Sequence, residues 1–304
     1  MKITRRQMLG ACAAVGLPVL ARPVWAGVTL EIGQARIETL SDGHLVLPRA
    51  FVLGDAPQPD ADEILANQGI TGQSFAPPCN LTLLRDGTNT VLFDAGSGPD
   101  FQPTAGKLSA ALDAVGVAPG DVTHVVFTHG HPDHLWGVLD DFGDPLFSGA
   151  RHLMGAAEFA YWRDPDTLSG IGAARQAFAV GARRRLDLLA ERITEVRDGQ
   201  EILPGVTARA SHGHTPGHMS YVLHQGRDSV MVLGDAVTNA HLGFLRPGWP
   251  SGSDQDPDRA AKARVALLDQ LAQDKMRLIG FHLPGAGIGR AEKTADGYRF
   301  VPEA

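Results

Sequence analysis

Three histidines and one aspartate fall within six residues, in the segment His129-Gly130-His131-Pro132-Asp133-His134. An apolar, β-branched run, 122–128, precedes the segment, and a helical pattern of apolar residues that begins at Leu135 follows it. Each imidazole carries ring nitrogens that need polar partners when they are buried. A metal ion would supply those partners, so the pattern predicts a metal site where a strand turns into a helix.

The spacing within this segment predicts two metal half-sites rather than one. His129 and His131 project to the same side of an extended strand end, because side chains on a strand repeat with a period of two. Pro132 suits the first turn of a helix, so Asp133 and His134 should point in a second direction. Each half-site then needs further ligands from elsewhere in the chain.

Three other stretches place a ligand residue at the end of a strand-like run. The turn 211–218 contains three histidines between two strand-like segments. The apolar run 230–234 ends at Asp235, and the run 278–281 ends at His282. Because each ligand lies just beyond an apolar strand, we expect the cluster at one edge of a sheet system.

The order of these motifs, His-x-His-x-Asp-His, Gly-His-Thr-Pro-Gly-His, Gly-Asp and a late His, resembles the metallo-β-lactamase superfamily. Four stretches look most similar to its methyl parathion hydrolase-like branch, and they also fit relatives that act on other esters or lactones: 40–43, 210–218, 284–289 and 297–302. The resemblance implies an α/β fold, the four-layer αββα sandwich, with the metals at one edge between the sheets.

The resemblance also assigns roles to single residues. It implies that one metal is held by His129, His131 and His214, and the second by Asp133, His134 and His282, with Asp235 bridging both. His214 is preferred because it precedes Thr-Pro-Gly-His as the family ligand does, which leaves His212 and His218 around the site. Asp94 resembles a family aspartate that orients a ligand imidazole or a loop amide. A simple turn aspartate is the alternative for Asp94.

The ligand types predict hydrolysis of an ester-like bond. Imidazole and carboxylate ligands suit two divalent ions, Zn²⁺ first, with Mn²⁺, Fe²⁺ or Co²⁺ as alternatives. A water shared by two cations loses a proton near neutral pH, so the expected nucleophile is a bridging hydroxide, held with the help of Asp133 and Asp235. The expected substrate is an aryl ester, a lactone or a phosphotriester.

Two aromatic residues are candidates for the substrate pocket. Phe101 and Trp162 align in order with aromatic pocket residues of the methyl parathion hydrolase-like branch, which predicts an apolar leaving-group site. Core packing is the alternative for each of them.

Three other functions remain open at this point: a β-lactam hydrolase of the same fold, a mononuclear iron oxygenase with one vestigial half-site, and a non-catalytic binding module. The Asp133-His134 pair, the Asp235 bridge and the tail 298–302 look less like the β-lactamases themselves. The seven filled ligand positions argue against the oxygenase and against the binding module.

The first 26 residues predict an export signal. Lys2, Arg5 and Arg6 precede an uncharged run, 8–20, and Val24-Trp25-Ala26 offers a small-residue cleavage site. The arginine pair resembles a twin-arginine signal, which exports folded proteins, and a generic secretory signal is the alternative. The run is shorter than the ~20 residues of a spanning helix. We therefore expect a periplasmic or secreted protein, with 27–304 as the hydrolase domain and no membrane attachment in the mature form.

Composition limits the partners. The chain has 304 residues, 43% of them hydrophobic and 20% charged, which indicates a globular protein with an ample core. Loss of the signal would remove four basic residues and no acidic one, so the formal net charge would move from −7 to −11. An acidic protein is a poor nucleic-acid binder. The expected partner is a small ester-like molecule, and a homodimer is an open alternative to a monomer.

The remaining patterns predict the elements that carry these residues. Residues 28–47 alternate as paired strands with a turn at Asp42-Gly43. The stretch 50–78 is irregular, with a short helical pattern at 61–67, and forms either a surface loop or an active-site flap. Cys79 would be the single cysteine of the mature chain, so we expect a buried, unpaired thiol. The longer helices are expected at 104–115, 156–162, 167–190 and 256–273.

Overall fold

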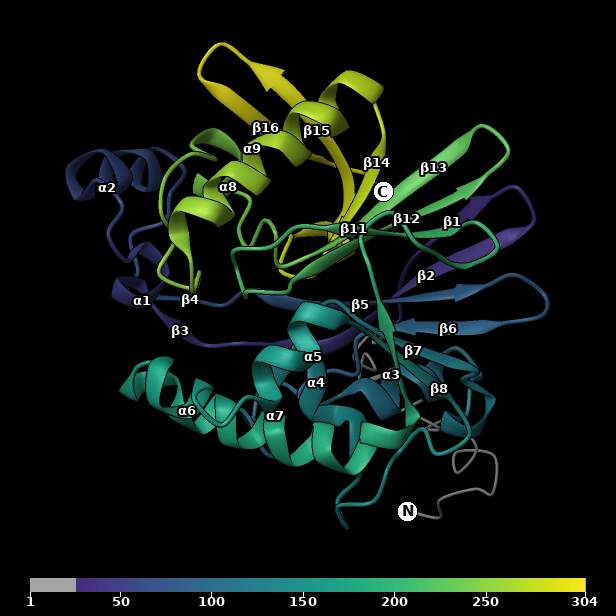
Figure 1. Cartoon of the computed structure of the whole chain (residues 1–304). Helices are drawn as coiled ribbons and strands as arrows, with labels where there is room; N and C mark the ends of the chain where they lie inside the picture. The colour runs from purple at the N-terminus through teal and green to yellow at the C-terminus, as the bar shows by residue number, and fades with distance from the viewer. Residues whose placement is uncertain (1–25, 304) are drawn as a thin grey trace, which may run out of the picture.

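Two β-sheets packed face to face form the centre of the molecule, and helices cover the outer face of each sheet (Figure 1). The computed structural model describes residues 26–303, so the predicted export signal lies outside the described residues. No helix among residues 26–303 is long and apolar enough to cross a membrane.

The first sheet carries the His-rich segment at 129–134. Its strand order is β1-β2-β5-β6-β7-β8-β9, antiparallel from β1 to β6 and parallel from β6 to β9. The strands are β1 (Ala26–Ile32), β2 (Ala35–His44), β5 (Pro78–Arg85), β6 (Thr90–Phe93), β7 (His124–Phe127), β8 (Arg151–Gly155) and β9 (Ile193–Val196). The helices on this side are α3 (Leu108–Ala114), α4 (Pro132–Leu135), α5 (Ala156–Arg163), α6 (Thr167–Gly170) and α7 (Gln176–Leu189).

The second sheet carries the later ligand residues. Its order is β10-β11-β12-β13-β14-β15-β16, antiparallel except for the parallel pair β13 and β14. The strands are β10 (Glu201–Leu203), β11 (Val206–Ala210), β12 (Met219–Gln225), β13 (Asp228–Gly234), β14 (Arg277–Gly280), β15 (Ile288–Thr294) and β16 (Gly297–Pro302). Between β13 and β14 the chain forms α8 (Leu242–Leu245) and α9 (Pro257–Asp274), which starts with Asp256 accepting a hydrogen bond from the Arg259 amide.

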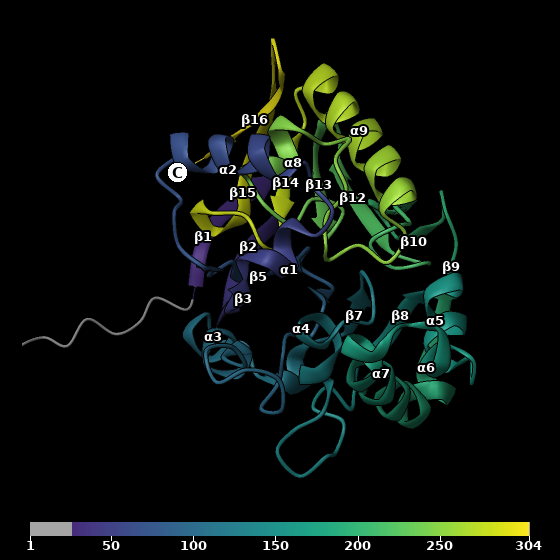
Figure 2. The same cartoon turned by 90° about the vertical axis from the view of Figure 1, so that its left-hand side faces the viewer.

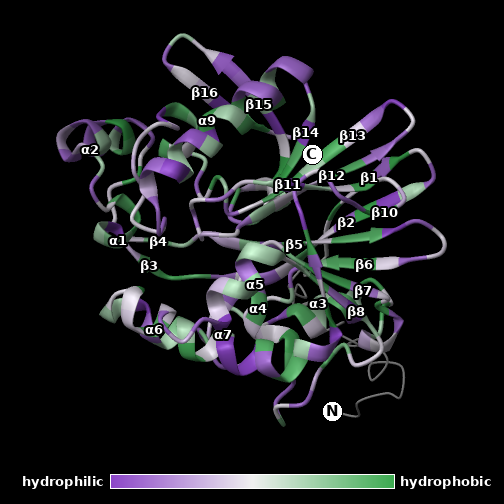
Figure 3. Cartoon of the chain, in the orientation of Figure 1, coloured by the Kyte–Doolittle hydropathy of each residue, from purple (hydrophilic) through white to green (hydrophobic). Residues whose placement is uncertain are grey.

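Hydrophobic packing occurs at three levels, which accounts for the four layers. Between the sheets, Ile37 and Phe93 of the first sheet pack in one cluster with Tyr221 and Val232 of the second. Other clusters join the first sheet to α3, α5 and α7, and the second sheet to α9. The turned view places α7 and α9 on opposite sides of the sheets (Figure 2), and hydrophobic residues follow strands such as β5 and β6 (Figure 3). The predicted αββα sandwich is confirmed.

The stretch between β2 and β5 forms a small structure of its own. It contains β3 (Leu47–Pro48), α1 (Arg49–Leu53), α2 (Gln58–Asn67) and β4 (Ser74–Phe75), and β3 pairs with β4. Leu53 and Leu65 pack against Leu242 of α8.

Three local predictions are wrong. The helix expected at 167–190 is interrupted between α6 and α7, where Gly172 adopts a φ of 84°. The turn expected at Asp42-Gly43 lies instead at Gly33 and Gln34, and β2 continues past Asp42 with a register irregularity at Gly43. Buried Asp42 accepts hydrogen bonds from the amides of Ser97 and Leu108, both at 2.8 Å. The helix expected from residue 104 begins at Leu108, because Gly106 adopts a φ of 76°, which an α-helix does not contain.

Candidate metal centre

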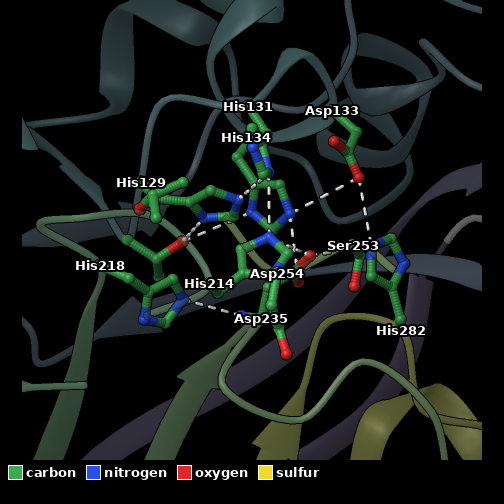
Figure 4. Close-up of polar contacts among 12 residues, drawn as sticks. His129, His131, Asp133, His134, His214, His218, Asp235, Ser253, Asp254 and His282 are labelled. Atoms are coloured by element: carbon green, nitrogen blue, oxygen red, sulfur yellow. Dashed lines mark hydrogen bonds and ion pairs between the residues drawn. The ribbon is translucent and has the colours of Figure 1, made fainter. Parts of the chain in front are cut away.

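All seven predicted metal ligands meet at one edge of the two sheets. Asp94 follows β6 and the His-rich segment follows the parallel neighbour β7, so both lie at the carboxyl edge of the first sheet. Asp235 follows β13 and His282 lies just after the parallel β14, at the facing edge of the second sheet. His214 comes from the turn between β11 and β12. Figure 4 shows these imidazoles and carboxylates pointing toward one another.

The first half-site is a group of three buried imidazoles. The Nδ1 atom of His131 lies 3.0 Å from Nε2 of His129 and 2.9 Å from Nε2 of His214. Three nitrogens at these separations can share one cation. The structure therefore brings together the residues that the first half-site requires.

The second half-site combines two imidazoles with a carboxylate. Oδ2 of Asp133 lies 3.2 Å from Nε2 of His282 and 3.5 Å from Nε2 of His134. Cys79 is buried close by, in a group with Asp133 and His282, and has no disulfide partner among the described residues.

The carboxylate of Asp235 faces both half-sites. Its Oδ1 lies 3.3 Å from Nε2 of His134. Its Oδ2 lies 3.3 Å from Nε2 of His214 and 3.4 Å from Nε2 of His282. This is the position that a bridging carboxylate needs.

Unsatisfied buried atoms support a metal at this place. Among the described residues, Oδ2 of Asp133, Nε2 of His134 and Oδ1 of Asp235 are buried and have no hydrogen-bond partner. Such atoms are costly unless a partner is supplied. Neutral imidazoles and carboxylates are ligands for divalent cations, so the donor set fits a divalent metal centre.

The imidazoles of the two half-sites differ in the direction of their pKa shifts. Burial, together with the neighbouring imidazoles, holds the pKa of His129 and of His131 well below the usual value, so both rings are neutral donors. Burial also opposes charge on His134, but Asp235, Asp133 and Asp94 outweigh it and raise its pKa to about 10. A cation in the second half-site would take the place of that proton.

Hydrogen bonds behind the ligands fix the orientation of their rings. Nδ1 of His134 donates to Oδ2 of Asp94 at 2.8 Å, and Nδ1 of His214 donates to Oδ1 of Asp254 at 3.1 Å. Nδ1 of His282 donates to the carbonyl of Pro78 at 2.8 Å. Each bond leaves the Nε2 lone pair directed into the cluster. Asp94 thus lies where the orienting role requires it, and its backbone has a φ of 63°.

Glu158, on α5, connects the two His-rich turns, and the sequence reasoning missed it. Its Oε1 accepts from the Gly130 amide at 2.8 Å and from Nε1 of Trp162 at 2.5 Å. Its Oε2 accepts from the Thr215 hydroxyl at 2.7 Å and the Gly217 amide at 2.9 Å. The available signal is a carboxylate among the otherwise uncharged residues of the expected helix 156–162.

His218 and His212 have different surroundings. Buried His218 accepts a hydrogen bond at Nε2 from the Asp235 amide at 2.9 Å and contacts Ser211 through Nδ1 at 2.8 Å. It therefore holds the backbone of the bridging residue. His212 is half-buried and joins none of the three candidate ligand groups.

A cavity of about 310 Å³ opens onto the ligand cluster. Five of the predicted ligands reach it: His131, Asp133, His214, Asp235 and His282. Its walls are largely apolar, and their larger side chains are Leu45, Leu47, Phe51, Phe75, Phe101 and Phe178. Because α1 and β4 contribute to these walls, the 50–78 stretch is part of the cavity.

Of the two aromatic residues predicted for the pocket, one lines the cavity and the other does not. Phe101 lines the cavity and packs edge-on against Phe178, with ring centroids 5.8 Å apart. Trp162 does not line it: the indole is 1% exposed and lies behind Gly130, with its Nε1 bound to Glu158. The pocket role predicted for Trp162 is not supported, because the helix turns the ring toward the back of the His-rich segment.

The family model described as Metallo-beta-lactamase superfamily matches residues 75–282. This range contains every ligand described above and spans more than half of the chain. The chain therefore belongs to the metallo-β-lactamase superfamily, and its metal centre is that of a metal-dependent hydrolase.

Three named proteins are similar to this chain in sequence or structure. The solved hydrolase AbOPH of the β-lactamase superfamily is 26% identical, with a TM-score of 0.86 over 93% of this chain and 99% of that one. The dizinc quorum-quenching lactonase AidC is 22% identical, with a TM-score of 0.86 over 92% and 99%. The N-acyl homoserine lactonase AttM of Azorhizobium caulinodans is 30% identical over 126 residues, 41% of this chain and 44% of AttM.

Proposed function

We propose that this protein is a dinuclear metal-dependent hydrolase of carboxylic esters, either lactones or aryl esters, with phosphotriesters as a further substrate class. The observation that carries the proposal is the cavity, whose base is the ligand cluster and whose walls are aromatic and aliphatic. An apolar substrate portion would fill the walls while its ester group lies against the ligands. We propose Zn²⁺ as the first choice of metal.

The chain contributes orientation and exclusion of water. When bound, two cations would polarise the ester carbonyl and lower the pKa of a water molecule. Asp235, which faces both half-sites, would hold the cations at a fixed separation, and Asp133 would complete the second half-site and orient the attacking water. The Phe51 and Phe101 side chains would exclude bulk water from the reacting group.

The cavity favours a leaving group that departs without a proton. Apart from the predicted ligands, its titratable lining residues within 26–303 are Arg175 and His241. Arg175 stays protonated, and burial lowers the pKa of His241, so neither is a good proton donor near neutral pH. A phenolate leaves without a proton, whereas an amine leaving group needs one. The lack of a proton donor among the described lining residues favours aryl esters over β-lactams.

The named relatives support the same substrate class. AttM carries the name N-acyl homoserine lactonase, and it shares 30% identity with part of this chain. AbOPH is described as a hydrolase. These names support a lactone or another ester as the substrate.

A substrate panel tests the proposal. The metal-loaded protein would be assayed with phenyl acetate, a γ-lactone bearing an apolar acyl chain, an aryl phosphotriester and a β-lactam. We expect turnover of the first two and weaker or no turnover of the β-lactam. Hydrolysis of the β-lactam alone would contradict the proposal.

A cavity variant provides the internal control for the panel. Phe101→Ala should raise KM for esters with a large apolar portion more than for phenyl acetate, because Phe101 forms part of the wall. Phe142→Ala is the matched control, since Phe142 is 91% exposed and does not line the cavity.

A further inference from the structure

Arg175 is a cation on the apolar wall of the cavity. It lies directly before α7 and is half-buried. Its Nη2 donates to the Gly252 carbonyl at 2.6 Å, and its Cζ lies 5.9 Å from the centroid of the Phe51 ring. Among residues 26–303, no carboxylate forms an ion pair with it.

The acidic residue with an electrostatic effect on Arg175 already binds two other side chains. Asp254 exerts an electrostatic effect on Arg175, but its Oδ2 is bound by Arg264 at 3.0 Å and its Oδ1 by His214 at 3.1 Å. Burial lowers the pKa of Arg175, although the guanidinium remains charged at any physiological pH. A guanidinium has five N–H donors, and among the described residues one of them has a protein acceptor.

Arg175 lies on the same cavity wall as Phe178, which contacts one of the predicted metal ligands. Phe178, three residues further along and on the same wall, contacts the His131 ring with centroids 5.9 Å apart. The charge of Arg175 also contributes to the lowered pKa of His131. A substrate whose ester group lies at the ligands would therefore extend past Phe178 toward Arg175.

We propose that Arg175 is a specificity-determining residue, which binds an anionic group, in the simplest case a carboxylate, on the apolar portion of the substrate. The free N–H groups match a carboxylate in geometry and charge, and partial burial strengthens the interaction. The proposal rests on the proposed ester hydrolysis and narrows its substrate class to esters that carry an acidic group. A purely structural role, in which Arg175 only ties Gly252 to α7, is the competing explanation.

A matched pair of esters separates the two explanations. The substrates are 4-acetoxybenzoate and 4-acetoxybenzamide, which have similar shape and differ in charge. For each metal-loaded variant, the ratio of kcat/KM for the acid to that for the amide is compared with the wild-type ratio, so that intrinsic reactivity cancels.

The expected result is a change in this ratio. Arg175→Met should lower it by roughly 10-fold, the size of one charge-assisted hydrogen bond, chiefly through KM for the acid. Arg175→Lys should retain most of the preference. Arg184→Met is the control and should leave the ratio unchanged, because Arg184 is an exposed residue of α7 outside the cavity. The wild-type preference should also weaken as salt is raised.

An equal loss of kcat/KM for both esters in Arg175→Met would overturn the proposal. It would show that Arg175 only ties Gly252 to α7. If wild type hydrolyses neither ester, the proposed function fails for this class, and calorimetric binding of the ethers 4-ethoxybenzoate and 4-ethoxybenzamide decides the role of Arg175 separately. Tighter binding of the acid that is lost in Arg175→Met supports the proposal. Binding of the two ethers that does not change in Arg175→Met overturns it, because a carboxylate held only by the metals does not need Arg175.

Discussion

At the scale of single residues, Asp235 faces both half-sites of the metal centre. Its two carboxylate oxygens face three imidazoles, from His134, His214 and His282, at 3.3 to 3.4 Å. Burial alone would raise its pKa, but His282 and His134 hold that pKa well below the usual range. The side chain is therefore an anion, as a bridging ligand has to be.

Replacing this anion by its amide tests the bridge. Asp235→Asn should weaken metal binding by at least roughly 100-fold, the upper end of what loss of an outer partner costs, and abolish most turnover. The fold should remain, because the backbone bond from Asp235 to His218 does not depend on the side chain. Metal content by elemental analysis and thermal melting measure the two effects.

Asp141→Asn, at an exposed position away from the cluster, is the control for this substitution. If the Asp235→Asn protein binds two metals and is fully active, Asp235 is not the bridging ligand.

For the secondary-structure elements, the critical connection runs from α5 to the two His-rich turns. Glu158 accepts four hydrogen bonds, so it holds the segment after β7 against the turn before β12. Burial raises the pKa of Glu158, whereas its donors, led by Thr215, favour the ionised form. The two turns carry all three ligands of the first half-site.

Glu158→Gln should therefore weaken metal binding, although Glu158 is not itself a predicted ligand. The new amide group cannot accept at one of the two oxygen positions, so we expect a loss of about 1–3 kcal/mol in the free energy of unfolding. We also expect a 10- to 100-fold loss in metal affinity, of the size seen for outer partners of ligands. Competition with a chromophoric chelator measures the affinity. Glu195→Gln, at an exposed position in β9, is the control, and lowered stability with unchanged affinity would restrict Glu158 to packing.

A second buried polar residue lies in β8, away from the metal centre. His152 is fully buried and stacks on Phe127, and neither ring nitrogen has a hydrogen-bond partner among the described residues. Burial, with a contribution from the charge of Arg192, lowers its pKa to about 4. The folded protein thus keeps this ring neutral where an unfolded chain, with a pKa near 6.5, would protonate it.

This shift predicts a loss of stability in acid. Between pH 6.5 and about 4 the unfolded state binds the extra proton, so the free energy of unfolding falls as pH falls through this window. His152→Leu should stabilise the protein by about 1–3 kcal/mol at neutral pH, and the gain should grow toward pH 4. Urea melts at several pH values measure it, with exposed His44→Leu as control. A variant less stable than wild type at every pH would contradict this assignment.

Across the whole molecule, the sequence predicts that the candidate ligands lie together, because its signals are local. The ligands occur in short motifs, and each one follows an apolar strand, so their convergence follows from parallel strands that end at one edge. The four-layer sandwich followed from the resemblance that these motifs carry.

What the sequence did not predict depends on long-range contacts. The carboxylate of Asp42 binds amides 55 and 66 residues further on, so a turn was the simpler local interpretation of Asp42-Gly43. Arg175 reaches Gly252, 77 residues away, and no local pattern indicates that contact. The direction of the Trp162 ring depends on its bond to Glu158 within α5 and on where α5 docks.

We propose that this chain holds two divalent metals and that its hydrolytic activity requires them. This proposal is tested by the metal content of the purified protein, measured by elemental analysis on the same sample that is assayed for ester hydrolysis before and after chelation. We predict two metals per chain, loss of activity on chelation, and recovery with Zn²⁺ or Mn²⁺. One iron per chain together with no hydrolysis of any ester would contradict the account and favour an iron oxygenase.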